Sequence, residues 1–82
     1  MKIPRDISAN SLIKFLESLG YTITRQKGSH IRLTYQSTES SHHITIPNHD
    51  PLKIGTLNSI LNDLANYNKI EKGELIDRLL SG

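Results

Sequence analysis

Cysteine is missing from the 82 residues, so the chain can form no disulfide and can offer no thiolate to a metal ion. Long apolar runs are missing too, and none approaches the ~20 residues that a membrane-spanning helix needs. The opening segment, MKIPRDIS, lacks the apolar stretch of a signal peptide. We therefore expect a protein of the reducing cytoplasm that is neither exported nor bound to a membrane.

The length of the chain limits what it can build. Domains typically start at about 50 residues, so we expect residues 1–82 to form a single small domain. A chain of this length can bury one modest core, but it has no room for a large internal cavity.

Acidic residues are also missing from one long stretch. The net charge of +2 is too small to indicate nucleic-acid binding by itself. No acidic residue falls between Glu17 and Glu39, however, whereas Arg25, Lys27 and Arg32 all do. Scattered solvating charge and a face that binds a polyanion explain this distribution about equally well.

Apolar residues recur at helical spacing in three stretches. The first predicts a helix over about 9–19, which Gly20 would end. The second predicts a helix over 56–66 with Thr56 as its N-cap. A short third helix is predicted over about 70–80. Its inward residues would be Leu75, Ile76, Leu79 and Leu80.

Three stretches between the first two helices alternate apolar and polar residues, which is typical of half-buried strands. They are YTITRQ, HIRLTY and HHITIP, separated by KGS and QSTESS. In the first, Tyr21 and Ile23 would share one side. The short loops imply an antiparallel meander with the helices on its apolar face. The predicted fold is therefore α+β, in the order α-β-β-β-α with a short C-terminal helix.

The strand register follows from keeping the apolar faces together, because a slip of one residue would send them to opposite sides. Ile23 is then expected opposite Leu33, which requires a three-residue loop, Lys27-Gly28-Ser29, with Gly28 at positive φ. Across the strands His30 would face Gln26, and Arg32 would face Thr24. In the second hairpin, Leu33 opposite Ile44 would place His30 beside Pro47.

One polar face of the sheet follows from this register. It would carry Gln26, His30, Arg32, Thr34, His43 and Thr45, with His49 near the His30 end. Arg25 is expected to point to the helix side or to lie at its rim. Arg32 is therefore the best placed of the three basic residues to contact a phosphate.

Several residues suggest a chemical role, but an ordinary structural explanation competes with each of them. Ser29 and His30 resemble a nucleophile and its base, but adjacent strand residues point to opposite faces. The four histidines lack recognisable metal-ligand spacing, so surface histidines are preferred and no metal site is expected. Gly55 and Thr56, at a helix start, suit a phosphate, yet simple capping explains them as well. His30 alone has a suitable ordinary pKa of ~6.5, but a lone strand histidine is more often structural or merely exposed.

Taken together, three segments resemble the HicA family of bacterial toxins, which are small mRNA interferases. They are FLESLGYTITRQKGSHIRL, ITIPNH and IGTLNSILNDL. The family pattern runs L-x-x-L-G-[FY], a G-S-H turn, an apolar strand ending in P-x-H, and G-T-L-x-x-I-L. All four motifs occur here in this order, across about residues 8–66. G-S-H alone would be weak, whereas the ordered set is fairly specific.

The resemblance implies a fold like that of double-stranded-RNA-binding domains, ribosome-independent cleavage of mRNA, and neutralisation by a HicB-type antitoxin. No cofactor is implied, and the free toxin is expected to be a monomer. The family's catalytic histidine, in G-S-H, falls on His30, and the histidine of P-x-H falls on His49. The residues expected to contact RNA or its phosphates are Arg25, Lys27, Gly28, Ser29, Arg32, His49 and Lys53.

The chemistry expected at His30 is proton transfer. RNA carries its own nucleophile in the 2′-hydroxyl, so a nuclease that uses no metal needs a base, an acid and positive groups for the phosphate. His30 would be the base or the acid, and water, a partner side chain or His49 would serve as the other group. Two alternatives stay open, a non-catalytic RNA-binding module and a purely structural interaction domain.

Overall fold

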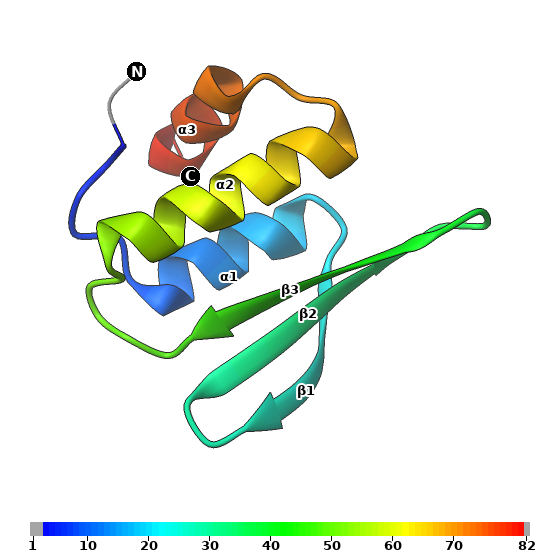
Figure 1. Cartoon of the computed structure of the whole chain (residues 1–82), viewed down its shortest axis with the longest axis horizontal. Coiled ribbons are helices and arrows are strands. Elements are labelled where there is room, and N and C mark those ends of the chain that lie inside the picture. The colour runs from blue at the N-terminus through cyan, green and yellow to red at the C-terminus, as the bar shows by residue number, and fades with distance from the viewer. Residues whose placement is uncertain (1–2, 82) are drawn as a thin grey trace.

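Six elements follow one another in a computed structural model that describes residues 3–81 (Figure 1). They are α1 (Ala9–Ser18), β1 (Thr22–Lys27), β2 (His30–Gln36), β3 (Ser41–Pro47), α2 (Ile54–Asn68) and α3 (Lys72–Ser81). The strands form one antiparallel sheet in the order β1-β2-β3. The predicted α+β class, its element order and its C-terminal helix are thereby confirmed.

The core lies between the sheet and the helices, which all lie on one side of it (Figure 1). Leu12 and Leu16 of α1, Leu33 of β2 and Leu61 of α2 are fully buried. The buried residues of each element recur at its own period, 3.6 residues in a helix and two in a strand, so each of these elements buries one face. No helix within the described residues has both the length and the apolar character needed to cross a membrane.

Two details of the helices differ from the prediction: the residue at which α2 begins and the exposure of Leu80. The α2 helix begins at Ile54, because the Leu57 N–H already donates to the Lys53 carbonyl at 3.0 Å, so Thr56 is not its N-cap. Leu80 was expected to face inward and is 61% exposed. The buried stripe of α3 consists of Leu75, Ile76 and Leu79, and Leu80 falls beyond its edge.

The first hairpin confirms one part of the predicted register and contradicts another. Ile23 lies opposite Leu33 and Gly28 has a φ of 57°, both as expected. The loop, however, is only Gly28-Ser29, so His30 pairs with Lys27 rather than with Gln26. The shorter loop leaves one residue too many in β1, and a β-bulge between Ile23 and Arg25 absorbs it.

The remaining pairings set the position of His30 and the exposure of β1. Leu33 lies opposite Ile44 and His30 lies opposite Pro47, which confirms the register of the second hairpin. All six residues of β1 are exposed, whereas a half-buried strand was expected. Ile23 is 48% exposed, although Tyr21 just before the strand is buried. The reason is that β1 is the edge strand farthest from the helices (Figure 1).

Candidate RNA-binding face

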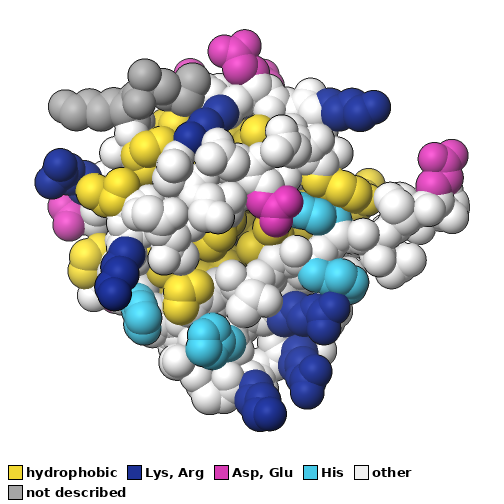
Figure 2. Space-filling view, in the orientation of Figure 1, with side chains coloured by type: hydrophobic (Ala, Val, Ile, Leu, Met, Phe, Trp, Pro, Cys, Tyr) yellow, Lys and Arg dark blue, Asp and Glu magenta, His cyan; other side chains and the backbone are white. Residues whose placement is uncertain are grey.

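A shallow hollow of about 230 Å³ lies on the side of the sheet that faces away from the helices, which we call the open face. Five side chains line it, and all five were predicted site residues or members of the polar face. They are Arg25, Lys27, His30, Arg32 and Thr45. Lys, Arg and His side chains gather over the strands in the lower part of the molecule (Figure 2).

The β-bulge explains why two basic residues of β1 reach this hollow. It places Arg25 opposite Arg32 and Lys27 opposite His30, and directly paired residues project to the same face. The expectation that Arg25 points to the helix side is therefore wrong, because it assumed unbroken alternation. Gln26 pairs instead with the buried Ile31 and is not part of the open face.

The basic side chains of the hollow form no ion pair with any acidic residue in the described part of the chain. Arg25 and Arg32 are directly paired, and like charges in that position destabilise a sheet. Both ion pairs found among the described residues lie elsewhere, between His42 and Asp63 and between Arg78 and Glu74. An anionic ligand would supply the missing charge.

His30 is the first residue of β2 and is exposed to solvent. Within the described part of the chain, no hydrogen bond orients its ring. The strand itself fixes its position between Lys27 on β1 and Pro47 on β3. An exposed imidazole at the edge of a basic hollow is within reach of a bound molecule and has the chemistry of a general acid or base.

The segment after β3 runs along the turn that precedes His30. The Asn48 N–H donates to the Ser29 carbonyl at 2.6 Å, and the His49 N–H donates to the Pro47 carbonyl at 2.8 Å. This brings the predicted site residues Ser29 and His49 to the same end of the sheet as His30. Lys53 follows four residues later as the N-cap of α2 and is exposed.

A second histidine has a different environment, which sequence reasoning did not find. The Tyr21 hydroxyl lies 2.6 Å from Nδ1 of His42, whose Nε2 lies 3.2 Å from Oδ1 of Asp63. The ring of His42 also stacks on Tyr67 at 4.2 Å. Burial raises the pKa of the Tyr21 phenol, although a hydrogen bond from Asn68 opposes the shift. No local pattern connects these residues, because strand and helix packing brings them together.

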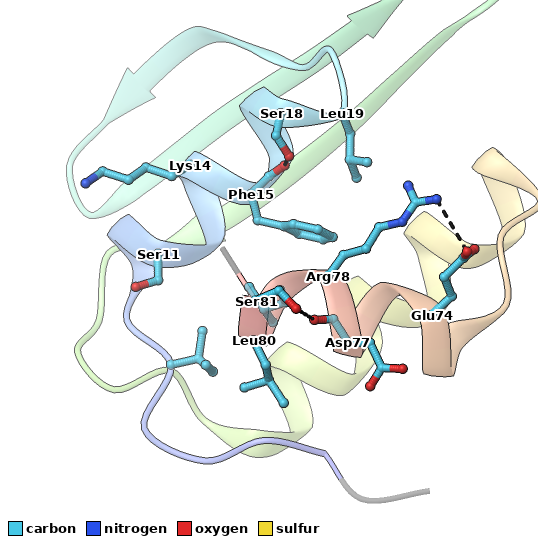
Figure 3. Close-up of a pocket in the computed structure, with 12 residues that line it drawn as sticks. Ser11, Lys14, Phe15, Ser18, Leu19, Glu74, Asp77, Arg78, Leu80 and Ser81 are labelled. Carbon is cyan, nitrogen blue, oxygen red and sulfur yellow. Dashed lines mark hydrogen bonds and ion pairs between the residues drawn. The ribbon is translucent and has the colours of Figure 1, made fainter.

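The open face is not a metal site within the described residues, and the larger of the two hollows lies elsewhere in the molecule. Within residues 3–81, no three His, Asp or Glu side chains gather as a metal-binding group. A groove of about 880 Å³ lies between α1 and α3, and none of the predicted site residues lines it. Phe15 points into this groove, and Arg78 on α3 forms an ion pair with Glu74, one turn earlier on the same helix (Figure 3).

Comparison with known proteins places the chain in a family. Residues 9–65 match a family model described as the HicA toxin of bacterial toxin-antitoxin. Searches of curated proteins and of solved structures found no match. The matched region includes the hollow, His30, His49 and most of α2, and it ends before α3. The chain therefore belongs to the HicA family and is the toxin of a bacterial toxin–antitoxin system.

Proposed function

We propose that this toxin is an endoribonuclease that cleaves mRNA without a metal ion and arrests growth. In this proposal His30 transfers a proton, and Arg25, Lys27 and Arg32 contact phosphates. Gly28, Ser29, His49 and Lys53 complete the RNA contacts. A HicB-type antitoxin neutralises the activity.

The observation that carries the proposal is the group of uncompensated basic side chains around His30. Arg25 faces Arg32, and Lys27 faces His30, without a compensating acid among the described residues. A fold keeps such a locally unfavourable arrangement most readily where a ligand uses it. The phosphates of RNA supply the complementary charge along a continuous strand.

The chemistry then needs little from the protein. The 2′-hydroxyl of RNA attacks the adjacent phosphorus and loses its proton, while the 5′-oxygen leaves and gains one. His30 acts as the base or the acid of this exchange, which is worth ~10²–10⁴-fold in rate. The guanidinium groups of Arg25 and Arg32 stabilise the charge that develops on the phosphate oxygens. No hydrogen-bonded partner within the described residues activates His30, so we expect a slow enzyme.

The decisive experiment compares the native protein with His30→Ala in an RNA-cleavage assay containing a chelator. We expect native protein to fragment RNA and the variant to lose at least 100-fold in rate, with an unchanged circular dichroism spectrum. RNA with a 2′-deoxy substitution at the cut site should resist cleavage. A folded His30→Ala protein that still cuts at the native rate would refute the assignment. RNA binding without any cleavage by native protein would favour a non-catalytic RNA-binding module.

The antitoxin is expected to act on the same face. An exposed basic face attracts an acidic partner, because complementary charge speeds association and opposes wrong partners. We propose that the HicB-type antitoxin covers His30 or blocks the access of RNA to it. Hydrogen exchange of β1 and β2 should slow in the complex. Inhibition with these strands still exchanging freely would require another mechanism.

A further inference from the structure

A row of hydrogen-bonded side chains crosses all three strands next to the basic hollow. Nδ1 of His43 on β3 lies 2.8 Å from Oγ1 of Thr34 on β2. That hydroxyl lies 2.8 Å from Oγ1 of Thr24, the bulged residue of β1. The Thr24 hydroxyl in turn lies 3.4 Å from the Arg32 carbonyl. The β-bulge therefore keeps Thr24 on the open face beside the two basic residues of β1.

The end of this row fixes its direction. A carbonyl oxygen only accepts, so the Thr24 hydroxyl donates to Arg32. Its oxygen is then free to accept from Thr34, whose oxygen accepts from the Nδ1–H of His43. If the donors ran in the opposite direction, the Thr24 hydroxyl would donate to Thr34, and no hydrogen would remain for its contact with the Arg32 carbonyl. In neutral His43 the proton is thus on Nδ1, and Nε2 has an unshared electron pair.

His43 lies too far from His30 to share its reaction. It pairs with Thr34, which follows His30 by four residues along β2, or ~13 Å of strand. It lies on the same face as His30, because residues separated by an even number along a strand project to one side. His43 is exposed, so its Nε2 is available to a molecule that continues along β2 beyond the hollow.

The open face favours contacts to the RNA backbone over base stacking. The four aromatic residues of the chain lie elsewhere, three of them in a cluster that joins Tyr21, Tyr35 and Tyr67, and the fourth, Phe15, in α1. Without Phe, Tyr or Trp, the open face has no large aromatic platform for a series of stacked bases. What every nucleotide offers to a hydrogen-bond acceptor is its ribose 2′-hydroxyl.

We propose that His43 is a binding residue for a ribose 2′-hydroxyl, at a nucleotide of the same RNA strand beyond the cleaved phosphate. Thr34 and Thr24 are its positioning residues, because they hold Nδ1 as the donor and leave Nε2 as the acceptor. This inference rests on the proposed binding of RNA to the open face. It adds a contact at which the toxin distinguishes RNA from DNA without taking part in bond cleavage.

The test measures binding, so it does not depend on cleavage. The His30→Ala protein is titrated with a short single-stranded RNA and with copies that each carry one 2′-deoxy nucleotide. We expect one deoxy position, away from the cut site, to weaken binding roughly fivefold, the effect of one lost hydrogen bond. When His43→Ala is added, the all-RNA ligand should bind roughly fivefold more weakly, and the deoxy effect at that position should disappear.

Two further variants separate positioning from general damage. Thr34→Val keeps the shape of the side chain and removes the partner of Nδ1, so it should reduce the deoxy effect at the same position. Ser41→Ala, on the same strand as His43 and outside the row, should leave every affinity unchanged. A deoxy effect that survives His43→Ala, or a scan without any sensitive position, would overturn the proposal. A His43-dependent loss of affinity that is set by the amino groups of the bases, and not by a 2′-hydroxyl, would also overturn it.

The outcomes also distinguish this inference from the proposed function. Cleavage that depends on His30, together with a flat deoxy scan, would leave the nuclease intact and remove the His43 contact. A His43-dependent position in a native protein that cuts no RNA would keep the contact and remove the catalysis. Absence of any RNA binding would remove both.

Discussion

Arg32 occupies the central position of the open face. It is half-buried between Arg25 on one neighbouring strand and Thr45 on the other. Its aliphatic stem can pack on the sheet while the guanidinium stays at the surface. A planar group held in this way suits two simultaneous hydrogen bonds to one phosphate.

Replacing Arg32 by Gln should therefore weaken RNA binding and reduce its salt dependence. One phosphate contact fewer lowers the slope of log affinity against log salt concentration by about 1. Lys14→Gln is the matched control, because Lys14 lies on α1 and lines the groove between α1 and α3 rather than the hollow of the open face (Figure 3). Fluorescence anisotropy at several salt concentrations measures both slopes. An equal change in the two variants would show that charge alone, without position, governs binding.

Among the elements, the β2–β3 hairpin and α2 are joined by polar and aromatic contacts. The Tyr21 hydroxyl contacts His42, which contacts Asp63 of α2. The Ser40 hydroxyl lies 2.6 Å from that of Tyr67, also on α2. These contacts fix the part of the hairpin that extends past the helices (Figure 1). They hold the sheet in place while its open face stays free.

Stability should fall at high pH through Tyr21. The unfolded phenol ionises near its ordinary pKa of 10.0, whereas burial raises the pKa in the fold, so the folded state holds the proton longer. Free energy of unfolding is therefore lost as the pH rises above about 10. Tyr21→Phe should show a smaller loss between about pH 8 and about pH 11. At neutral pH it should cost about 1–2 kcal/mol, since His42 and Asn68 lose a partner.

Urea unfolding at the two pH values measures both effects. Native protein and Tyr21→Phe are compared at each pH, so that the ionisation of other groups cancels in the difference. An equal loss of stability in the two proteins would show that the Tyr21 phenol is not responsible.

Most of the elements could be predicted from the sequence because they follow from local periodicity. Ile23 opposite Leu33 followed from the apolar pattern alone. The bulge did not, because a two-residue loop with one extra strand residue and a three-residue loop have the same length and the same apolar pattern. The position of Arg25 depended on that choice. The contacts of His42 were also out of reach, since they need the packing of α2 on the hairpin.

At the scale of the whole molecule, α3 completes the core although the family match ends before it. Leu75, Ile76 and Leu79 are buried in the same cluster as the residues of α1, α2 and the sheet. Lys72 also hydrogen-bonds to Asn58 of α2. The helix therefore belongs to the folding unit of the toxin and is more than an appendage.

Truncation after residue 71 should accordingly prevent stable folding. Losing three buried apolar side chains removes roughly 5–9 kcal/mol of burial free energy. That is comparable with the whole stability of a small domain. Leu80→Ser, at an exposed position of the same helix, should change stability by less than about 0.5 kcal/mol. Circular dichroism and thermal unfolding measure both, and a truncated chain that melts like native protein would contradict the expectation.

Because of the bulge in β1, in-frame deletions of two nearby codons should change the sheet in different ways. Loss of codon 24 removes the extra residue, so Arg25 stays opposite Arg32 in a regular ladder. Loss of codon 26 gives a chain of the same length and an equally regular ladder, in which Arg25 lies opposite Ile31 and projects towards the helices. Two in-frame deletions a few bases apart thus leave Arg25 on opposite sides of the sheet, although the first removes Thr24 and the second removes Gln26. Among bacteria that survive the toxin, the second deletion should be the commoner.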